Sequence, residues 1–418
     1  MQEIMLQKKT PFLPFVFILL IFFVTVTACQ LPIQQQTDTE SKPDLEATIM
    51  VLQTQMIEAS KQTEEPGPKD SLSPTEHSKI KQPDPTSSDL FQGFYALQDG
   101  RFRAYDFIGN SLGVDFPAGS SNWYGDNEIN AFIDEIFYTE FSSNSGVFRV
   151  NAEGTQKFNF IDAQDPVYIA VSPDRQKIAW STSSWGEGNL KTEIFYANMD
   201  GSNQQLVDVI STDEQVDLNL NFFPVRWTDD GRLIYATGMT GIGGYMLFWG
   251  FNGMYLFNPL NNSIRTLVDD QERLGICLSS ISDDLTKIAI VCGGEGNVRV
   301  RSLDSGTETI FPIIEDQVLA GAARFSLSGE YLAYVVQRAD PMQELGKIVV
   351  VPVDGSQPPR VLTTVEDGSY TVEGWVCEDY FLVTQTYLST SEISVLKLNR
   401  DGSEVIHIAD GKFMDFIP

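Results

Sequence analysis

The chain has 418 residues, 42% of them hydrophobic, which is enough apolar material for a packed core and excludes a wholly disordered protein. Its formal net charge of −29 disfavours binding to nucleic acid or to anionic lipid surfaces, because their phosphates would be repelled. With only two histidines, His77 and His407, the chain has little material for a metal cluster or a histidine-dependent triad, and we expect no metal or cofactor.

The N-terminus has the features of an export signal. Two lysines precede an apolar run over 11–26, which is short for a membrane span and typical of the hydrophobic region of a signal peptide. The run ends at Val26-Thr27-Ala28-Cys29, and this ending resembles the bacterial lipoprotein signal motif. The resemblance implies cleavage of 1–28, lipidation of Cys29, and a protein anchored on the extracytoplasmic side of a bacterial cell envelope. An uncleaved signal anchor is the alternative.

Residues 29–89 are rich in Gln, Thr, Ser, Pro, Glu and Lys, a composition that predicts a flexible, lipid-anchored linker. One stretch, 44–60, differs from the rest. Its apolar residues recur at alternating steps of four and three, the spacing of a helical seam: Leu45, Ile49, Leu52, Met56 and Ala59. We interpret it either as a short helix that pairs with a second copy or as a transient amphipathic helix in the linker.

From residue 90 onward a hairpin recurs, made of an apolar strand, a tight polar turn and a second apolar strand. Clear copies occupy 171–180, 227–235, 281–290 and 325–334. Their spacing of roughly 45 to 50 residues indicates stacked β units, and units of four strands build a propeller. We therefore predict that 90–418 is an all-β domain, a seven-bladed β-propeller of four-stranded antiparallel sheets.

A second recurring turn, typified by Asp-Gly, marks the last two strands of each unit, because a two-residue hairpin needs the positive φ that these residues tolerate. It recurs at 152–154, 199–202, 258–261, 303–306, 353–356 and 400–403. The connections between second and third strands are often long, at 181–192, 238–253, 337–346 and 384–392. Strand geometry places these long connections on one face, which we take as the better candidate for recognition.

The first unit supplies only three strands, at 94–97, 102–105 and 112–116, whereas residues 413–417 follow a complete last unit. We predict that this C-terminal strand enters the first blade and closes the ring. Closure would remove the exposed sheet edge that an open array presents.

The repeat resembles that of the TolB-like family of WD40-like propellers, which carries Ser-Pro-Asp-Gly between its first two strands. Ser172-Pro173-Asp174 comes close to that turn, with Arg175 in place of the glycine. The resemblance covers roughly 90–418 and implies the fold rather than an activity, since members range from periplasmic scaffolds to propellers that cap hydrolases.

Three cysteines lie in the propeller region. In the hairpin around 284 and 285, partner numbers sum to about 569, which places Cys277 opposite Cys292. Directly opposed residues can reach disulfide distance, and an exported protein meets an oxidising environment, so we predict a bridge, with buried thiols as the alternative. Cys377 is interpreted as a small core residue.

Two arginines share one position of the repeat. Arg226 and Arg324 each lie two residues before the turn, on strands expected to line the central channel, so both guanidinium groups could bind an anion there. Pairing with nearby acidic side chains is the alternative.

Aromatic residues in the long connections suggest another surface. The apolar segment 238–251 is interpreted either as a plug packed over the channel or as an adhesive patch. A surface for stacking on sugar rings would combine four residues: Trp185, Tyr245, Trp249 and Tyr387.

The sequence has no His-Glu-x-x-His helix, no phosphate-binding glycine loop and no dinucleotide fingerprint. We therefore expect no catalytic residues and predict an extracytoplasmic, membrane-anchored scaffold or binding module for a protein partner. The alternatives are a polysaccharide lyase or hydrolase, or a binder of carbohydrate or a small anion in the channel.

Overall fold

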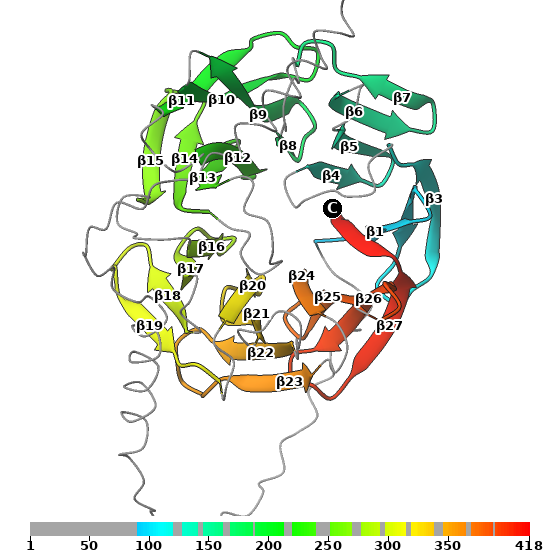
Figure 1. Ribbon diagram of the computed structural model, residues 1–418, viewed down its shortest axis with the longest axis vertical. Coiled ribbons are helices and arrows are strands. Elements are labelled where there is room, and N and C mark those ends of the chain that lie inside the picture. The colour runs from blue at the N-terminus through cyan, green and yellow to red at the C-terminus, as the bar shows by residue number, and fades with distance from the viewer. Residues whose placement is uncertain are drawn as a thin grey trace, which may run out of the picture. The chain divides into compact units, whose positions relative to one another are not determined.

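The structure, a computed structural model, describes residues 90–119, 128–140, 145–161, 168–186, 189–212, 220–239, 251–269, 277–292, 297–314, 319–337, 346–364, 369–387 and 389–418 (Figure 1). By internal contacts the chain divides into Met1–Ser78 and Lys79–Pro418, and every described residue belongs to the second unit. The predicted signal peptide, Cys29, the linker and its short helix lie outside the described residues.

The described residues form seven four-stranded antiparallel sheets placed around a ring, which confirms the predicted propeller (Figure 1). We number the blades in chain order. Blade 1 combines β28 (Lys412–Ile417) with β1 (Gly93–Gln98), β2 (Arg101–Tyr105) and β3 (Ser111–Pro117). Blade 2 contains β4 (Ile129–Phe132), β5 (Glu135–Glu140), β6 (Gly146–Asn151) and β7 (Gly154–Lys157). Blade 3 contains β8 (Ile169–Val171), β9 (Lys177–Gly186), β10 (Asn189–Asn198) and β11 (Gln205–Thr212).

The remaining blades follow the same order from the innermost strand outward. Blade 4 contains β12 (Leu220–Trp227), β13 (Leu233–Met239), β14 (Gly253–Asn258) and β15 (Ser263–Val268). Blade 5 contains β16 (Cys277–Ile281), β17 (Lys287–Cys292), β18 (Val298–Ser302) and β19 (Glu308–Phe311). Blade 6 contains β20 (Leu319–Phe325), β21 (Tyr331–Gln337), β22 (Lys347–Pro352) and β23 (Arg360–Thr364). Blade 7 contains β24 (Ser369–Cys377), β25 (Tyr380–Thr386), β26 (Ile393–Asn399) and β27 (Val405–Asp410).

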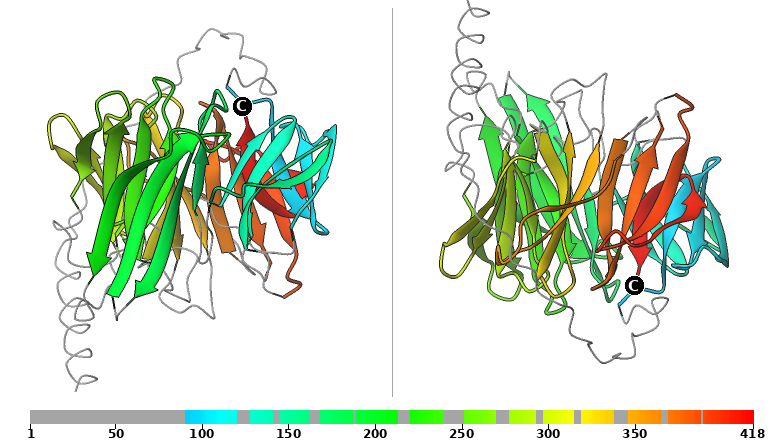
Figure 2. Two further views of the ribbon diagram at one scale, coloured as in Figure 1. Left: turned by 90° about the horizontal axis from the view of Figure 1, so that it is seen from above. Right: turned by 90° about the horizontal axis from the view of Figure 1, so that it is seen from below.

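Up-and-down connectivity gives the ring two distinct faces. Figure 2 views the ring from its edge, where the strands of each blade cross its thickness. Turns between first and second strands, and between third and fourth strands, share one face, which we call the turn face. Connections between second and third strands, and crossings between blades, share the opposite face, which we call the loop face.

The recurring polar turn is built the same way in several blades. In blade 3, the amide of Ser172 donates to the carbonyl of Lys177 at 2.9 Å. The Ser172 hydroxyl accepts from the Lys177 amide at 2.9 Å and donates to Oδ1 of Asp174 at 2.6 Å. In blade 4 the Thr228 hydroxyl likewise donates to Asp230 and accepts from the amide of Arg232. The short polar side chain therefore closes each hairpin by satisfying backbone groups that the turn leaves unpaired.

The C-terminal strand closes the ring, as predicted. β28 pairs antiparallel with β1, with Phe416 opposite Phe94 and Ile417 opposite Gly93. The amide of Gln92 donates to the carbonyl of Ile417 at 2.7 Å, which extends the ladder past the end of β1. Ile417 is fully buried. The red β28 accordingly lies beside the cyan β1 (Figure 1).

A buried lysine also joins the last blade to the first. Lys397, on β26, is 2% exposed, and its ammonium donates to the carbonyl of Phe107 in blade 1 at 2.7 Å. The same ammonium lies 5.2 Å from the centre of the Tyr380 ring. Burial lowers the pKa of Lys397, because desolvation disfavours its charged form.

The core consists of wedges between neighbouring blades. One cluster joins Phe137 of blade 2 to Ile178 and Trp180 of blade 3, and another joins Tyr95 of blade 1 to Tyr138 of blade 2. Each blade therefore buries both of its faces, which explains why second strands read as nearly continuous apolar runs.

One predicted connection differs from the structure. Residues 181–192, expected to be mostly loop, largely belong to β9 and β10, which remain paired out to Gly186 and Asn189. Ser and Thr make up four of the six residues in the extra length of β9, and the β-branched Thr182 favours a pleated strand that reaches past the blade core. The connections at 240–250 and 338–345 lie outside the described residues.

Candidate functional site

One position on each innermost strand forms a ring around the centre of the propeller, and we call it the bridging position. In blades 3 to 6 it lies two residues before the Ser or Thr that begins the polar turn, and in the other three blades it has the equivalent register on the innermost strand. Within the described residues, the bridging position is occupied in blade order by Asp415, Asn130, Ala170, Arg226, Ser280, Arg324 and Gly374.

In blades 1 and 2 the bridging side chain caps backbone of the next blade. Oδ2 of Asp415 accepts from the amide of Ala131 at 2.9 Å. Oδ1 of Asn130 accepts from the amide of Val171. Innermost strands have no further strand on the side that faces the centre of the propeller, so their amides there require another acceptor. These side chains provide one and tie adjacent blades together.

The predicted arginines lie at the bridging position of blades 4 and 6. Nη2 of Arg226 lies 3.0 Å from Oδ1 of Asp283, in the turn of blade 5, without the geometry of a hydrogen bond. In blade 6, Arg324 donates from Nε to the carbonyl of Glu373 at 3.2 Å and from Nη1 to that of Ala323 at 3.2 Å. The two arginines therefore share one level of the ring, and each has a partner inside the protein. Their role in anion binding stays a prediction.

Two tryptophans bridge blades in the opposite direction, and the sequence reading missed them. Nε1 of Trp227 donates to the carbonyl of Ala170, and Nε1 of Trp375 donates to the carbonyl of Arg324, both at 3.0 Å. Both side chains are nearly fully buried. Each tryptophan directly follows the bridging residue of its own strand. This shared position in the repeat could have identified them from the sequence.

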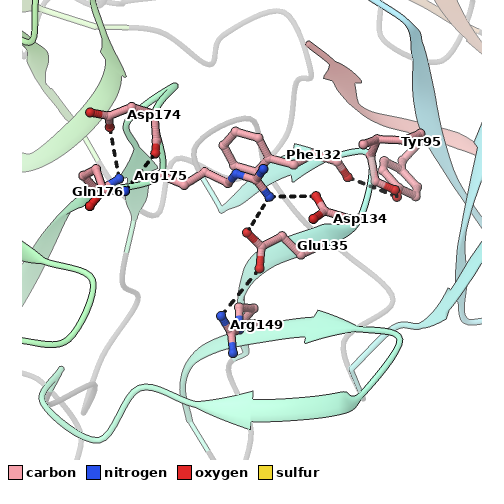
Figure 3. A network of polar contacts seen from close by, with 9 residues as sticks. Tyr95, Phe132, Asp134, Glu135, Arg149, Asp174, Arg175 and Gln176 are labelled. Carbon is pink, nitrogen blue, oxygen red and sulfur yellow. Dashed lines mark hydrogen bonds and ion pairs between the residues drawn. The ribbon is translucent and has the colours of Figure 1, made fainter.

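A second polar cluster lies on the turn face where blades 2 and 3 meet (Figure 3). Nη1 of Arg175 donates to Oδ1 of Asp134 at 2.7 Å and to Oε1 of Glu135 at 3.0 Å. The Glu135 side chain is 12% exposed, and its other oxygen lies 3.6 Å from Nη1 of Arg149. The Arg175 guanidinium also lies 5.1 Å from the centre of the Phe132 ring. These contacts raise the pKa of Arg175, chiefly through the hydrogen bond to Glu135.

The same cluster extends to blade 1. The hydroxyl of Tyr95 donates to the carbonyls of Phe132 and Ile133, at 3.2 and 3.1 Å. Burial raises the pKa of Tyr95, and the nearby carboxylate of Asp134 adds to the effect. The turn between β4 and β5 is thus held from both sides, and three consecutive blades are fixed to one another.

Arg175 holds these contacts from an unusual backbone conformation. Its φ is 55°, in the left-handed region, at the place where the TolB-like repeat has glycine. The equivalent residues are Gly231, Leu285 and Gly329, with φ of 78°, 58° and 68°. A side chain at this position costs backbone energy, which its contacts must offset.

The predicted aromatic surface is not assembled within the described residues. Trp185 pairs with Leu190 in β9 and β10, although its side chain lies outside the described residues, as do Tyr245 and Trp249 altogether. Tyr387 is half-buried just after β25, where its amide donates to the carbonyl of Glu392 at 2.9 Å. Sugar binding by these residues stays a prediction.

The predicted cysteine register agrees with the structure, since Cys277 and Cys292 are direct partners in β16 and β17. Their side chains lie outside the described residues. Cys377 is a free, half-buried thiol in β24.

Within the described ranges, no group of three or more His, Cys, Asp or Glu residues could hold a metal ion. Nor does any helix there have the length and apolar character needed to cross a membrane.

The chain was compared with known proteins. No family model and no curated protein matches it. Among solved structures, TolB from Acinetobacter baumannii is 13% identical, with 78% of this chain and 81% of that chain covered and a TM-score of 0.39.

A second match is a prolyl endopeptidase structure, which is 12% identical with a TM-score of 0.50 and covers 77% of this chain. This chain spans only 50% of that longer protein. Prolyl oligopeptidase B from Galerina marginata is 10% identical, with 78% and 52% covered and a TM-score of 0.48. Likeness at these identities concerns the fold alone. The described part of this chain is a seven-bladed β-propeller by its own sheet topology, and TolB is among the solved structures to which it is similar.

Proposed function

We propose that this chain is a lipid-anchored, extracytoplasmic propeller that binds a protein partner through its loop face. The supporting observation is that polar side chains at the bridging position and on the turn face contact neighbouring blades. The side chains of Asp415, Arg226 and Arg324 each contact a polar group of the next blade. Such contacts make a rigid scaffold, and connections carried on a rigid scaffold are the usual place for recognition.

The anchor in this proposal is Cys29, at the end of the predicted signal peptide. Because the chain carries a net charge of −29, an anionic bilayer surface repels it, and attachment depends on the acyl chains. Metabolic labelling with a palmitate analogue tests this step. The native chain should be labelled and sediment with membranes, whereas Cys29→Ser should be unlabelled and soluble. Label retained by Cys29→Ser would contradict the anchor.

Site-specific photocrosslinking in intact cells tests recognition by the loop face. A photoreactive residue at Thr390, exposed in the connection between β25 and β26, should give a discrete protein adduct. The matched control is Asp354, which is exposed in the turn between β22 and β23 on the turn face. Adducts formed mainly from Asp354, or equally from both positions, would contradict recognition by the loop face.

A second candidate function is small-anion binding in the channel. The observation that favours it is the equivalent placement of Arg226 and Arg324 on two innermost strands. Calorimetric titration with a dicarboxylate should show saturable binding that the double change to alanine abolishes while the fold survives. Absence of binding to the native chain would exclude this function. Turnover of a glycan panel by the same preparation would instead favour the polysaccharide-acting alternative.

A further inference from the structure

The inner hairpin of blade 5 ends in two cysteines. β16 and β17 pair in continuous register, with Ile281 opposite Ile288 near the turn and Cys277 opposite Cys292 at the far end. That far end lies on the loop face, because the turn between first and second strands lies on the turn face. The pair is thus the last one before the connections that lead into β16 and out of β17.

The hydrogen-bonding pattern of the hairpin determines which kind of pair the cysteines form. The amide of Ser282 donates to the carbonyl of Lys287 at 3.0 Å, so 282 and 287 are a hydrogen-bonded pair. Antiparallel ladders alternate between hydrogen-bonded and non-hydrogen-bonded pairs. With no register shift between β16 and β17, the hydrogen-bonded pairs are 280 with 289 and 278 with 291. Cys277 and Cys292 therefore form a non-hydrogen-bonded pair.

The corresponding hairpin of blade 3 supports this count. There the amide of Ser172 donates to the carbonyl of Lys177 at 2.9 Å. Four residues earlier in the chain, the carbonyl of Tyr168 accepts from the amide of Ser181 at 3.1 Å. Hydrogen-bonded pairs thus recur every second residue from the polar turn, as the count in blade 5 requires.

A non-hydrogen-bonded pair is the geometry in which opposed side chains come closest. Its Cα atoms lie about 4.5 Å apart, against about 5.5 Å in a hydrogen-bonded pair. Disulfides span Cα distances of about 4.4 to 6.8 Å, so a bond between such partners needs no movement of the strands.

The fold leaves these two cysteines no other partner within the propeller. Cys377 ends β24, next to the turn that leads into Tyr380, and so lies on the turn face of blade 7. Cys277 begins the equivalent strand of blade 5, on the opposite face, with blade 6 between them. The remaining cysteine, Cys29, lies near the N-terminus, and the proposed lipidation would occupy its sulfur.

We propose that Cys277 and Cys292 form a disulfide that staples the loop-face end of the β16–β17 hairpin. The bond forms by exchange with an external disulfide. The two thiols lose two protons and two electrons, and the external disulfide is reduced to two thiols. The bond fixes the residues from which two loop-face connections start. Its formation in cells rests on the proposed extracytoplasmic location, whereas its formation in an oxidising buffer depends on the fold alone.

Peptide mapping by mass spectrometry tests the bond directly. The purified full chain is equilibrated with oxidised glutathione, denatured, alkylated without reduction and digested. We expect the peptides carrying Cys277 and Cys292 to be linked, and the peptide carrying Cys377 to be alkylated or joined to glutathione. Cys277 and Cys292 both recovered without the link would overturn the proposal. A link from either of them to Cys377 would overturn it as well.

Variants measure what the bond does. Cys277→Ser and Cys292→Ser should each lower the midpoint of thermal unfolding, and the double variant should be no less stable than the single ones. A reducing agent should shift the midpoint of the native chain and leave that of the double variant unchanged. Cys377→Ser is the matched control and should retain the linked peptides. If reduction breaks the link but leaves the midpoint of thermal unfolding of the native chain unchanged, the stapling role is refuted.

The same mapping on protein taken directly from cells separates this proposal from the proposed function. A chain that links in glutathione but arrives reduced from cells upholds the bond and contradicts the extracytoplasmic location. A chain that links in neither preparation refutes the bond and leaves the location to the Cys29 labelling experiment.

Discussion

Arg175 combines a strained backbone with a set of interblade contacts, and substitution separates the two effects. Arg175→Ala keeps the strain and loses the contacts. The hydrogen bond to the largely buried Glu135 contributes about 1.5 to 3 kcal/mol, because it joins two charged groups. The pair with Asp134, whose side chain is 64% exposed, adds about 0 to 1 kcal/mol. Since Arg149 remains near Glu135 and Arg175 is itself 40% exposed, we expect a total loss of about 2 kcal/mol.

Arg175→Gly loses the same contacts but relieves the left-handed conformation. The relief relative to alanine is about 1 kcal/mol, after allowing for the greater freedom of glycine in the unfolded chain. We therefore expect the free energy of unfolding to fall in the order native, Arg175→Gly, Arg175→Ala. Urea unfolding followed by tryptophan fluorescence measures each value, provided that the dependence on urea is unchanged.

Leu285 supplies the matched control, since it occupies the same turn position in blade 5 with φ of 58° and forms no ion pair. Leu285→Gly should exceed Leu285→Ala in stability by the same 1 kcal/mol or so, because only backbone strain distinguishes them. If Arg175→Gly proved more stable than the native chain, strain would outweigh the contacts. The proposed role of Arg175 in joining blades 2 and 3 would then be refuted.

Three single contacts should each make a measurable contribution to stability. The Ser172 hydroxyl and the Gln176 amide hold the pKa of Asp174 below its ordinary value, so this carboxylate stabilises the fold at neutral pH, and its contribution is lost as pH falls through that depressed pKa. Ser172→Ala should weaken that loss in acid titrations of stability, and an unchanged acid profile would count against it. Trp375→Phe removes the donor to the Arg324 carbonyl and should cost about 1 to 3 kcal/mol in urea unfolding, whereas no loss would mean that the bridge is dispensable. Ile417→Ala should cost about 2 to 5 kcal/mol, since the side chain is fully buried, and a cost near zero would place β28 outside the core.

Features within one repeat were predictable from the sequence. The polar turn fixed the hairpin register, and adding partner numbers placed Cys277 opposite Cys292, as the structure shows. The three-stranded first unit and the surplus strand at the C-terminus predicted the closure by β28. Both inferences rest on local alternation and on the sheet edge that an open ring would leave.

Contacts between repeats were not predictable in the same way. Asp134 and Glu135 precede Arg175 by about 40 residues, and they meet it because adjacent blades bring their turns side by side. Which residues of the two turns come into contact depends on how one blade is placed against the next, and the periodicity within a blade does not determine that placement. The same holds for Arg226 and Arg324. Comparing the repeats with one another showed that the two arginines share a position. Their contacts with Asp283 and Glu373 could not be predicted, because these partners belong to the neighbouring blade.

The two faces and the contacts between blades depend on closure of the ring by the last strand, and amide hydrogen exchange of the full chain tests this closure most directly. In a closed ring, the amides of β28 and β1 should be protected as strongly as those of β20 and β21, because all four strands pair within complete blades. Rapid exchange over 412–417, alongside slow exchange in β20 and β21, would show that β28 does not close the ring.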